Sequence, residues 1–469
     1  MLALAGCTVG PNYRRPSAAV PPAFKGAELS NPPGGAWKQA QPGGVPLAGD
    51  WWKLYGDAQL NDLESRIVVS NQRLKSAYQA YIQSRQQITV DRSSLFPTLG
   101  LRAGGSRNQA SANRPFALPG RDNTYGDINL DGGVAWEPDL WGSVRRTVES
   151  SKAEAQASNA DLASVALSLQ SELALNYFQL RGLDSEQQLL DETVADYRQF
   201  VHLTSLRFEA GLASDSDVAL AQTQLDLTIA QASELGVARA QYEDAIATLI
   251  GTPASSFRLP PAPLHVVLPA IPAGLPSDLL ERRPDVAAAE RRVDAANARI
   301  GIAQAAFYPT LNLNGAGGFE TASLGTLIQG PSALWGLGAS AAQTLFDAGR
   351  RRAVKGQAAA AYSQSTAQYR ETVLQAFQEV EDSLSATRIL GTESAQQEKA
   401  VADAERSLKI STGLYKQGLG DYLQVLTVQQ SLLSSRRTSV NLETRRATAN
   451  VELIKSLGGG WDVTRLPKL

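Results

Sequence analysis

The feature that most restricts the fold of this 469-residue chain is a pair of long stretches without proline, residues 139–252 and 332–466. In the first stretch, apolar or small residues recur at alternating steps of three and four positions, the heptad-like spacing that packs one helix along another. One glycine-rich turn interrupts each stretch, at 210–215 and at 417–421, so each predicts a helical hairpin. The first arm, roughly 144–209, would extend about 100 Å at 1.5 Å per residue. A helix of that length must pack sideways in a wall or tube, because no globular core could enclose it.

The two hairpins belong to two copies of one larger pattern. Residues 74–99 align with residues 286–311, and both segments end in an aromatic residue followed by Pro-Thr-Leu. Residues 207–225 align with residues 414–432, and both carry Gly-Leu at the turn. The offsets are 212 (286 − 74) and 207 (414 − 207) positions. A period of about 200 residues is far longer than that of solenoid repeats, so a domain-sized unit has been duplicated.

Each copy shows the same order of expected elements: a helix, two strands and the long hairpin. Helix-compatible sequence covers 60–95 and 277–307, and polar and apolar residues then alternate with the period of two that is typical of strands. The expected strands lie at about 98–106, 127–136, 310–318 and 334–345. The resulting division gives a first repeat at 51–257 with its hairpin at 144–250, a proline-rich linker at 258–276, a second repeat at 277–457 with its hairpin at 350–457, and a C-terminal tail at 458–469.

The N-terminal sequence resembles the targeting signal of a bacterial lipoprotein. A Leu-Ala-Gly tripeptide stands directly before Cys7, the only cysteine of the chain, in the arrangement of a lipobox whose thiol receives a diacylglycerol group. A small buried cysteine is the alternative, but the proline-rich sequence that follows offers it no core. We expect residues 7–50 to form a lipidated extended segment. Residues 1–6 are expected to be the remnant of a lipoprotein signal peptide, because they are too few for a complete one.

Charge and hydropathy narrow the class of protein. The chain has 44 Lys and Arg against 46 Asp and Glu, a balance that does not favour nucleic-acid binding. No run of eighteen or more apolar residues is present, so the sequence predicts no ordinary membrane-spanning helix.

Barrel strands need only about ten alternating residues each, and a sheet that spans a membrane must close into a barrel. Four strands are too few, since the smallest common barrels have about eight, so several copies must pool their strands.

Aromatic residues gather where helices give way to strands. Proline disfavours helix in the residue before it, so the Phe-Pro and Tyr-Pro steps mark these junctions. Ordinary core aromatics are the alternative, but a concentration at strand ends is typical of the aromatic girdle at a membrane interface. The expected interfacial residues are Phe96, Trp136, Trp141, Phe307, Tyr308, Trp335 and Phe346.

The sequence offers no arrangement for catalysis. His202 and His265 stand in unrelated contexts, without the spacing of a catalytic triad or of a metal site. The Gly-Ala-Gly-Gly run at 315–318 lacks the preceding strand and the helix start of a phosphate-binding loop, so these glycines are expected to pack within a strand. We expect no enzyme activity, no metal and no cofactor apart from the covalent lipid on Cys7.

The order of elements and several motifs resemble the TolC-type outer membrane factors, in particular the efflux lipoprotein branch exemplified by OprM. The motifs are LLERRPDVAAAERRVDAANARIGIAQAAFYPTLNL at 279–313, WEPDLWGSVRR at 136–146, LFDAGRRR at 345–352 and the lipobox at Cys7. The resemblance implies an α+β membrane protein: a homotrimer with a twelve-stranded β-barrel, four strands per chain, continuous with a long periplasmic α-helical barrel. It also implies a lipid-anchored position in the outer membrane, contact with its lipid, and two partners, a periplasmic adaptor and an inner-membrane pump of the RND type.

The same resemblance implies a closable aperture at the tips of the helical hairpins, where acidic, aromatic and basic residues set closure and ion passage. A ring of acidic side chains lining a pore acts as a cation filter. An alternative role as N-caps of the returning helices is open to Asp215, Asp217 and Asp421. One carboxylate can both cap a helix and line the pore. Carried onto this chain, the tip comprises Arg207, Gly211, Leu212, Asp215, Asp217, Tyr415, Lys416, Gly418, Leu419, Asp421 and Tyr422.

Together these features predict the exit duct of a tripartite efflux system. Such a duct passively conducts small molecules that an inner-membrane pump and a periplasmic adaptor deliver. Two alternatives stay open: the outer-membrane duct of a type I protein secretion system, and a non-conducting periplasmic coiled-coil scaffold tethered by lipid. The scaffold leaves the strand pairs and their aromatic ends unexplained.

Overall fold

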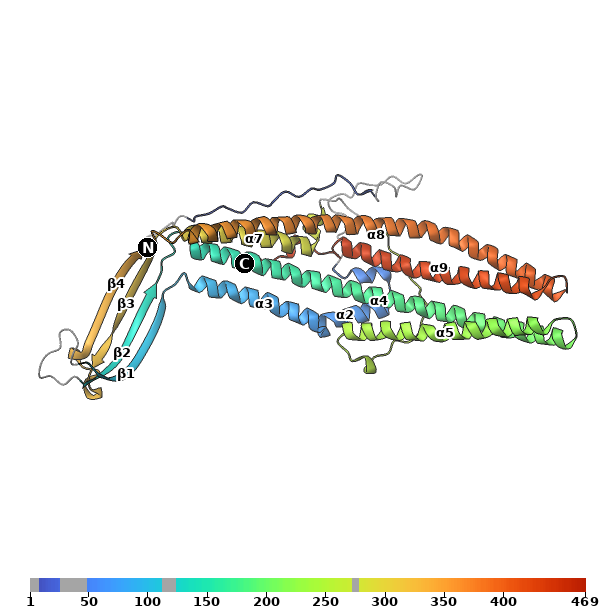
Figure 1. The fold of residues 1–469 in the computed structure, drawn as a ribbon, viewed down its shortest axis with the longest axis horizontal. Helices are drawn as coiled ribbons and strands as arrows, with labels where there is room; N and C mark the ends of the chain where they lie inside the picture. Colours follow the sequence, from blue (N-terminus) through green and yellow to red (C-terminus); the bar gives the residue numbers. More distant parts are fainter. Residues whose placement is uncertain (1–7, 26–48, 112–123, 272–277) are drawn as a thin grey trace.

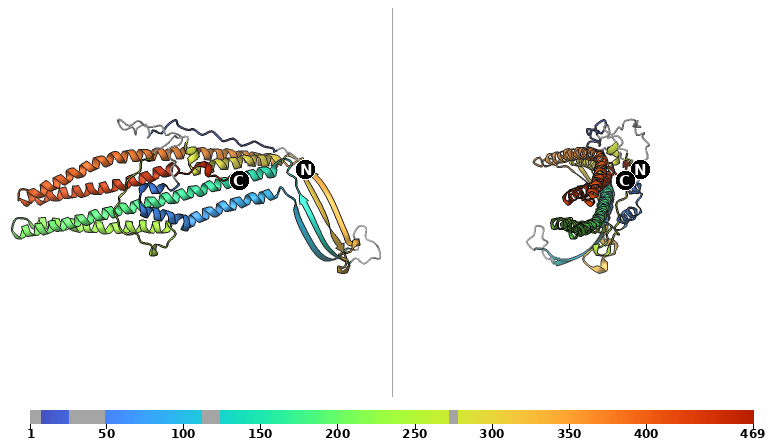
Figure 2. Two further views of the ribbon diagram at one scale, coloured as in Figure 1. Left: turned by 180° about the vertical axis from the view of Figure 1, so that it is seen from behind. Right: turned by 90° about the vertical axis from the view of Figure 1, so that its right-hand side faces the viewer.

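The computed structural model describes residues 8–25, 49–111, 124–271 and 278–469. A β-sheet occupies one end of an elongated molecule, and long helices run from it to a pair of hairpin tips at the other end (Figure 1). Seen along its length, the helical part is a curved layer, with the C-terminus and the N-terminal segment on its convex side (Figure 2).

The chain forms the same succession of elements twice. The first half comprises η1 (Trp51–Tyr55), α2 (Ala58–Ser70), α3 (Gln72–Ser93), β1 (Thr98–Gln109), β2 (Thr124–Trp136), α4 (Ser143–Glu209), α5 (Asp215–Leu249) and η2 (Ala254–Ser256). The second half comprises α6 (Leu279–Arg282), α7 (Pro284–Ala305), β3 (Thr310–Thr321), η4 (Leu324–Thr326), η5 (Gly330–Ser332), β4 (Ala333–Ala342), α8 (Arg350–Lys416), α9 (Tyr422–Ser456) and η6 (Val463–Arg465). Both α4 and α8 have 67 residues, and both α5 and α9 have 35, so the duplication extends to helix length.

The four strands form one antiparallel sheet in the order β1-β2-β3-β4. The two halves of the chain meet where β2 pairs with β3, for example at Val134 opposite Gly315. The outer strands β1 and β4 each have a neighbour on one side only. The sheet therefore presents two edges with backbone groups available for further pairing.

The two faces of the sheet differ in chemistry. The pairing register aligns Leu99, Val134, Gly315 and Leu337 in one row across the sheet, and Leu101, Gly132, Gly317 and Trp335 in the next row on the same face. Leu99 and Leu337 are 84% and 82% exposed, so this apolar face meets no other part of the described chain. The opposite face carries small and polar residues, among them Arg102, Asn129, Asp131, Asn312, Asn314 and Glu320. Apolar residues on one face and polar residues on the other are typical of a barrel strand that separates lipid from water.

The long helices pack side by side, and the largest hydrophobic core lies midway along them. Helix α4 contacts α3, α5, α7 and α9, whereas α8 contacts α7 and α9. In the core, Trp51 and Tyr55 of η1 pack with Phe178 of α4, whose ring lies 5.0 Å from that of Tyr55. Within the described part of the chain, no helix combines the length and the apolar character needed to cross a bilayer.

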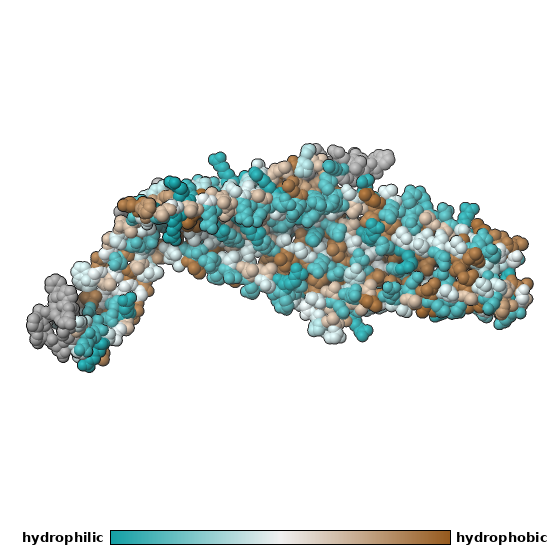
Figure 3. All heavy atoms as spheres, in the orientation of Figure 1, coloured by the Kyte–Doolittle hydropathy of each residue, from teal (hydrophilic) through white to brown (hydrophobic). Residues whose placement is uncertain are grey.

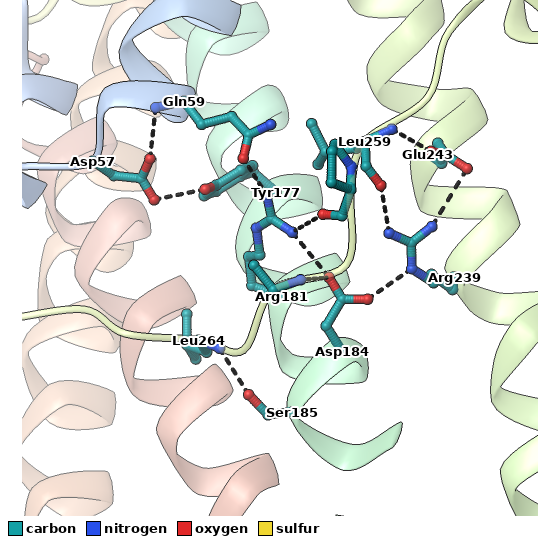
Figure 4. Close-up of polar contacts among 12 residues, drawn as sticks. Asp57, Gln59, Tyr177, Arg181, Asp184, Ser185, Arg239, Glu243, Leu259 and Leu264 are labelled. Carbon is teal, nitrogen blue, oxygen red and sulfur yellow. Dashed lines mark hydrogen bonds and ion pairs between the residues drawn. The ribbon is translucent and has the colours of Figure 1, made fainter. Parts of the chain in front are cut away.

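A buried ionic network holds the linker between the two halves against the first hairpin (Figure 4). Asp184 of α4 accepts from Arg181 at 2.9 Å and from Arg239 of α5 at 2.7 Å. The two arginines donate onward to the linker carbonyls of Pro260 and Leu259, at 2.8 and 2.7 Å. Because the side chains of Arg181 and Asp184 are only 4% and 3% exposed, these charges depend on one another and on the linker backbone for compensation.

The N-terminal segment 8–25 follows the outside of α7 and α8 as an extended strap (Figure 1). Arg146 of α4 is 2% exposed and donates to the carbonyls of Val9 at 3.2 Å and Gly10 at 3.3 Å. Farther along, Phe24 is buried in a core with residues of α7 and α8. The strap is therefore fixed both near the sheet and midway along the helices.

The helices that lead into the sheet are each broken, where the sequence pattern predicted one continuous helix at 60–95 and at 277–307. At Asn71 the backbone is extended, with ψ 124°, and the side chain caps α3 by accepting from the Leu74 N–H at 3.0 Å. At Arg283 the backbone is extended as well, because the next residue is Pro284. A local capping side chain and a proline override the helix-compatible composition.

The strand bounds also differ from the expected ones. β1 and β3 continue to Gln109 and Thr321, and β2 begins at Thr124, because backbone pairing persists after the side-chain alternation fades. β4 ends at Ala342, opposite Thr310, rather than at 345. Beyond that last pair no partner strand remains for the residues that follow.

Candidate functional site

The two hairpin turns at the tips have the same geometry. Each long helix ends in a Schellman motif: the Gly211 N–H donates to Phe208 O at 2.8 Å, and the Leu212 N–H donates to Arg207 O at 2.7 Å. The second turn repeats this pattern at Gly418 and Leu419, which donate to Tyr415 O and Leu414 O. The glycines have φ of +72° and +77°, the left-handed conformation that such a C-terminal position requires.

The returning helices are capped by side chains. Ser214 and Asp217 form a reciprocal capping box on α5, with distances of 3.2 and 3.0 Å. Asp421 occupies the position equivalent to Ser214 and accepts from the Gln424 N–H at 2.8 Å. Asp215 lies in the first turn of α5, where the helix dipole favours its negative charge. Two of the three expected gate carboxylates therefore also serve as caps.

Arg207 and Tyr415 connect the two hairpins at this end. The guanidinium carbon of Arg207 lies 4.7 Å from the ring centroid of Tyr415, and its Nη1 is 3.4 Å from the Lys416 carbonyl oxygen. The Tyr415 ring in turn lies 5.7 Å from the ring of Tyr422. Both tyrosines are buried in a small core with Ala221 of α5. The structure thus brings Arg207, Tyr415, Lys416 and Tyr422 together as one contact between the hairpins.

Several buried polar atoms in this region have no hydrogen-bond partner among the described residues. These atoms are Nε of Arg207, the hydroxyl groups of Tyr197 and Tyr415, and Oε1 of Gln429. The pKa of Tyr422 is raised to about 12, mainly by burial and to a smaller extent by the nearby Tyr197, Tyr415 and Asp217. Sequence reasoning missed Tyr197 and Gln429; their only signal was a polar residue at a seam position of the heptad pattern.

Apolar side chains are exposed at the tips, interspersed with polar ones (Figure 3). Leu212 is 68% exposed and Leu419 is 72% exposed, so these two expected residues lie outside the buried core around Tyr415 and Tyr422. Other exposed apolar residues at the same end are Leu206, Phe208, Leu220 and Leu423. The tip therefore combines an internal contact that can hold it shut with exposed apolar side chains on its outer surface.

At the other end of the helices, most of the expected aromatic residues lie at the junction with the sheet. Trp141 stacks on Tyr308 with ring centroids 4.8 Å apart, and its Nε1 donates to the Pro309 carbonyl at 2.7 Å. Trp136 donates to the Leu95 carbonyl at 3.1 Å.

The remaining aromatic residues are placed differently. Arg351 lies over the Phe307 ring at 5.6 Å, and Phe96 and Phe346 are 64% and 86% exposed. Trp335 is an exception to the junction cluster, because it pairs with Gly317 in the half of the sheet far from the helices. The lipidation candidate Cys7 lies outside the described residues.

No part of the described chain assembles three or more His, Cys, Asp or Glu side chains as metal ligands. The chemistry available at the tips consists of a cation over an aromatic ring, capped helix ends and carboxylates facing water. Such groups can hold two hairpins together and bias the passage of ions.

Comparison with known proteins agrees with this geometry. The family described as outer membrane efflux protein matches residues 63–252 and 275–459. The probable efflux pump outer membrane protein TtgC of Pseudomonas putida is 30% identical over 461 residues, covering 98% of this chain and 93% of TtgC. The solved CmeC outer membrane channel of Campylobacter jejuni superposes with a TM-score of 0.89 at 25% identity, over 98% of this chain and 96% of CmeC. The outer-membrane channel OprN superposes with a TM-score of 0.87 at 28% identity, over 97% of this chain and all of OprN.

The fold and these matches confirm the resemblance seen in the sequence. The chain belongs to the outer membrane efflux protein family, the TolC-type outer membrane factors.

Proposed function

We propose that this protein is the outer-membrane exit duct of a tripartite efflux system, which passively conducts small molecules. The observation that carries the proposal is the sheet: one exposed apolar face, one small and polar face, and two open edges. A sheet of this kind is stable in a bilayer only when its edges are paired in a closed barrel. The relatives named as efflux pump outer membrane proteins support small molecules as the cargo.

The duct is a homotrimer. Helix α4 lies between α3 and α5 on one flank and α7 and α9 on the other. Its counterpart in the duplication, α8, packs mainly on α9 and α7, with a small contact to α6, and among the described residues no long helix covers its other flank. The free flank of α8 therefore fits the α3 and α5 of a second copy. Packing of a second copy would bury large apolar residues that are exposed on these helices: Val354, Leu374, Ile389 and Ile410 on α8, Val90 on α3, and Leu227 and Val237 on α5.

Three copies joined in this way pool twelve strands (3 × 4) in one barrel. The number three rests on family membership. The β1 edge of one copy pairs with the β4 edge of the next, and the polar face lines a water-filled lumen. The helices continue this lumen as a tube in the periplasm.

The remaining parts of the proposal concern the partners and the anchor. Cys7 carries a lipid that adds an anchor in the outer membrane, and the strap fixes the chain that follows it along the helices. The hairpin tips meet a periplasmic adaptor, and an inner-membrane pump of the RND type supplies the energy. The duct itself performs no catalytic step.

The experiment is single-channel recording of the detergent-purified full-length protein in planar bilayers, with its mass measured in parallel. A trimeric mass with small, flickering currents is the expected result. A monomer that never inserts would overturn the proposal. Replacing Cys7 with serine separates the duct from a tethered scaffold: the duct stays in the membrane fraction without its lipid, whereas a scaffold is released.

A further inference from the structure

The strap lies in a groove between α7 and α8 that recognises it through particular contacts. Tyr13 donates a hydrogen bond to Glu290 and lies under Arg291, whose guanidinium carbon is 5.7 Å from the ring centroid. Arg15 donates to the Leu280 carbonyl at 3.1 Å. Near its end, Phe24 is 1% exposed and enters a core that includes Val286, Tyr369 and Val373.

The duplication creates a second groove of the same kind between α3 and α4. Offsets of 212 for the shorter helix and 207 for the longer one relate the two halves of the chain (286 − 74 and 414 − 207). Applied to the residues that contact the strap, these offsets give Val68 for Leu280, Leu74 for Val286, Tyr78 for Glu290, Gln79 for Arg291, Leu162 for Tyr369, and Ala166 for Val373. All six of these counterparts line one groove with a volume of about 510 Å³.

This second groove has the chemistry of a peptide site. Leu74, Leu162 and Ala166 form part of an apolar lining that Trp461 of the C-terminal tail extends. Lys75 and Arg465 supply two positive charges, and no carboxylate is among the residues that line it. The exposed fractions of Tyr78 and Val68, 49% and 61%, leave these side chains free to contact an occupant.

We propose that the α3–α4 groove binds an extended segment of a periplasmic partner protein, one that presents an aromatic side chain beside carboxylates. The α7–α8 groove binds an extended segment that carries Tyr13 and Phe24. Its counterpart between α3 and α4 is therefore expected to accept an extended backbone as well. The positive rim, without a carboxylate, favours an acidic segment over a copy of the strap, which carries Arg14 and Arg15.

The strap of the same chain lies elsewhere, and we expect a neighbouring copy to leave this groove open. The strap is committed to its own site by Arg146 at one end and Phe24 at the other. At the α7–α8 groove, the strap lies on the outer surface of α7, whereas α4 packs on a different side of the same helix. A second copy that packs on α3 in the corresponding way leaves the α3–α4 groove open.

The test uses two fluorescent peptides and the full-length trimer in detergent. One peptide has the sequence of residues 8–25, and the other has the same sequence with Arg14→Glu and Arg15→Glu. Anisotropy titration is expected to show saturable binding of the acidic peptide, with one site per chain and an affinity about tenfold above that of the basic one. Lys75→Glu removes this preference and Tyr78→Ser weakens binding, whereas the exposed Lys399→Glu on α8 leaves both unchanged.

A flat titration with both peptides, or binding that ignores Lys75→Glu and Tyr78→Ser, would overturn the proposal. A photo-reactive residue at position 78 identifies other occupants. A cross-link within one chain to residues 26–48, or a cross-link to a second copy, would show that the groove is already occupied in the protein itself. Because conductance plays no part in these measurements, their failure would leave the proposed duct untouched.

Discussion

The guanidinium carbon of Arg207 on α4 lies 4.7 Å from the ring centroid of Tyr415 on α8, and this pair joins the two hairpins at their tips. Tyr415 is 3% exposed, and the Arg207 side chain also approaches the Lys416 carbonyl. A cation over an aromatic ring contributes about 0.5–2 kcal/mol, more where water is excluded. Because this contact ties one hairpin to the other, losing it favours separation of the tips.

Arg207→Ala is expected to raise the open probability of the channel. A loss of about 0.5–2 kcal/mol corresponds to a shift of roughly 2- to 30-fold in the open-to-closed ratio. Single-channel recording in planar bilayers measures this ratio directly. Arg198→Ala is the matched control, because Arg198 is an exposed arginine on the same helix. Equal open probabilities in the two variants would contradict a gating role for Arg207.

Two substitutions of Asp421 separate its role as a helix cap from its role as a negative charge at the channel tip. Asparagine caps a helix about as well as aspartate, whereas alanine does not. Asp421→Asn should therefore keep the stability of the hairpin while lowering the preference of the channel for cations. Asp421→Ala should lower cation preference equally and also cost about 1 kcal/mol of unfolding free energy. Reversal potentials in a salt gradient report selectivity, and thermal unfolding reports stability; a selectivity change in the alanine variant alone would rule out the charge effect.

Asp184→Asn is expected to destabilise the middle of the molecule. Asp184 compensates Arg181 and Arg239, and its side chain is 3% exposed. Removing one partner of a buried ionic group costs about 3–5 kcal/mol, since the remaining charges lose their compensation. Thermal unfolding followed by circular dichroism should show a clearly lower midpoint. The exposed Asp191→Asn on the same helix should leave the midpoint unchanged, and equal midpoints for both variants would refute the argument.

The fold could be predicted from the sequence where a repeated pattern spans many residues. The helical hairpins followed from two stretches without proline, and the sheet followed from alternating residues next to aromatic-proline steps. Close approaches could not be foreseen in this way. Gly182 lies in the middle of α4, yet a Cβ there would come within 2.1 Å of Thr444 Oγ1 on α9. Such a contact depends on how two distant helices cross, which single-sequence periodicity does not encode.

At the candidate site, too, the local features could be predicted from the sequence and the tertiary contacts could not. The expected tip residues lie near the two turns because glycine and N-cap signals mark helix ends locally. Which of them touch is a tertiary property: Arg207 meets Tyr415 across 208 positions (415 − 207), while Leu212 and Leu419 stay exposed. Trp335 was grouped with the helix junction, but the register of β3 with β4 places it toward the other end of the sheet.

Asp294 on α7 gives the stability of the protein a dependence on pH. Burial raises the pKa of this carboxyl group to about 6; Glu149 and Glu290 also raise it, and Arg291, which pairs with it at 3.2 Å, opposes the rise. Its side chain is 15% exposed. The folded protein therefore holds this proton more tightly than the unfolded chain, in which a carboxyl of this type has a pKa of about 3.9.

As the pH rises from about 4 to about 6, the unfolded chain releases the proton before the folded protein does, so this residue lowers stability across that window. A shift of about two units corresponds to at most roughly 3 kcal/mol. Asp294→Asn removes the titration, so the stability difference between variant and parent should grow in favour of the variant from pH 4 to pH 6 and then level off. Thermal midpoints measured at half-unit steps test this, and parallel curves would mean that Asp294 titrates as it does in the unfolded chain. Carboxylates far from Asp294 affect both proteins equally, so the difference between the curves, rather than either curve alone, reports Asp294 together with the neighbouring Glu149 and Glu290, which interact with it.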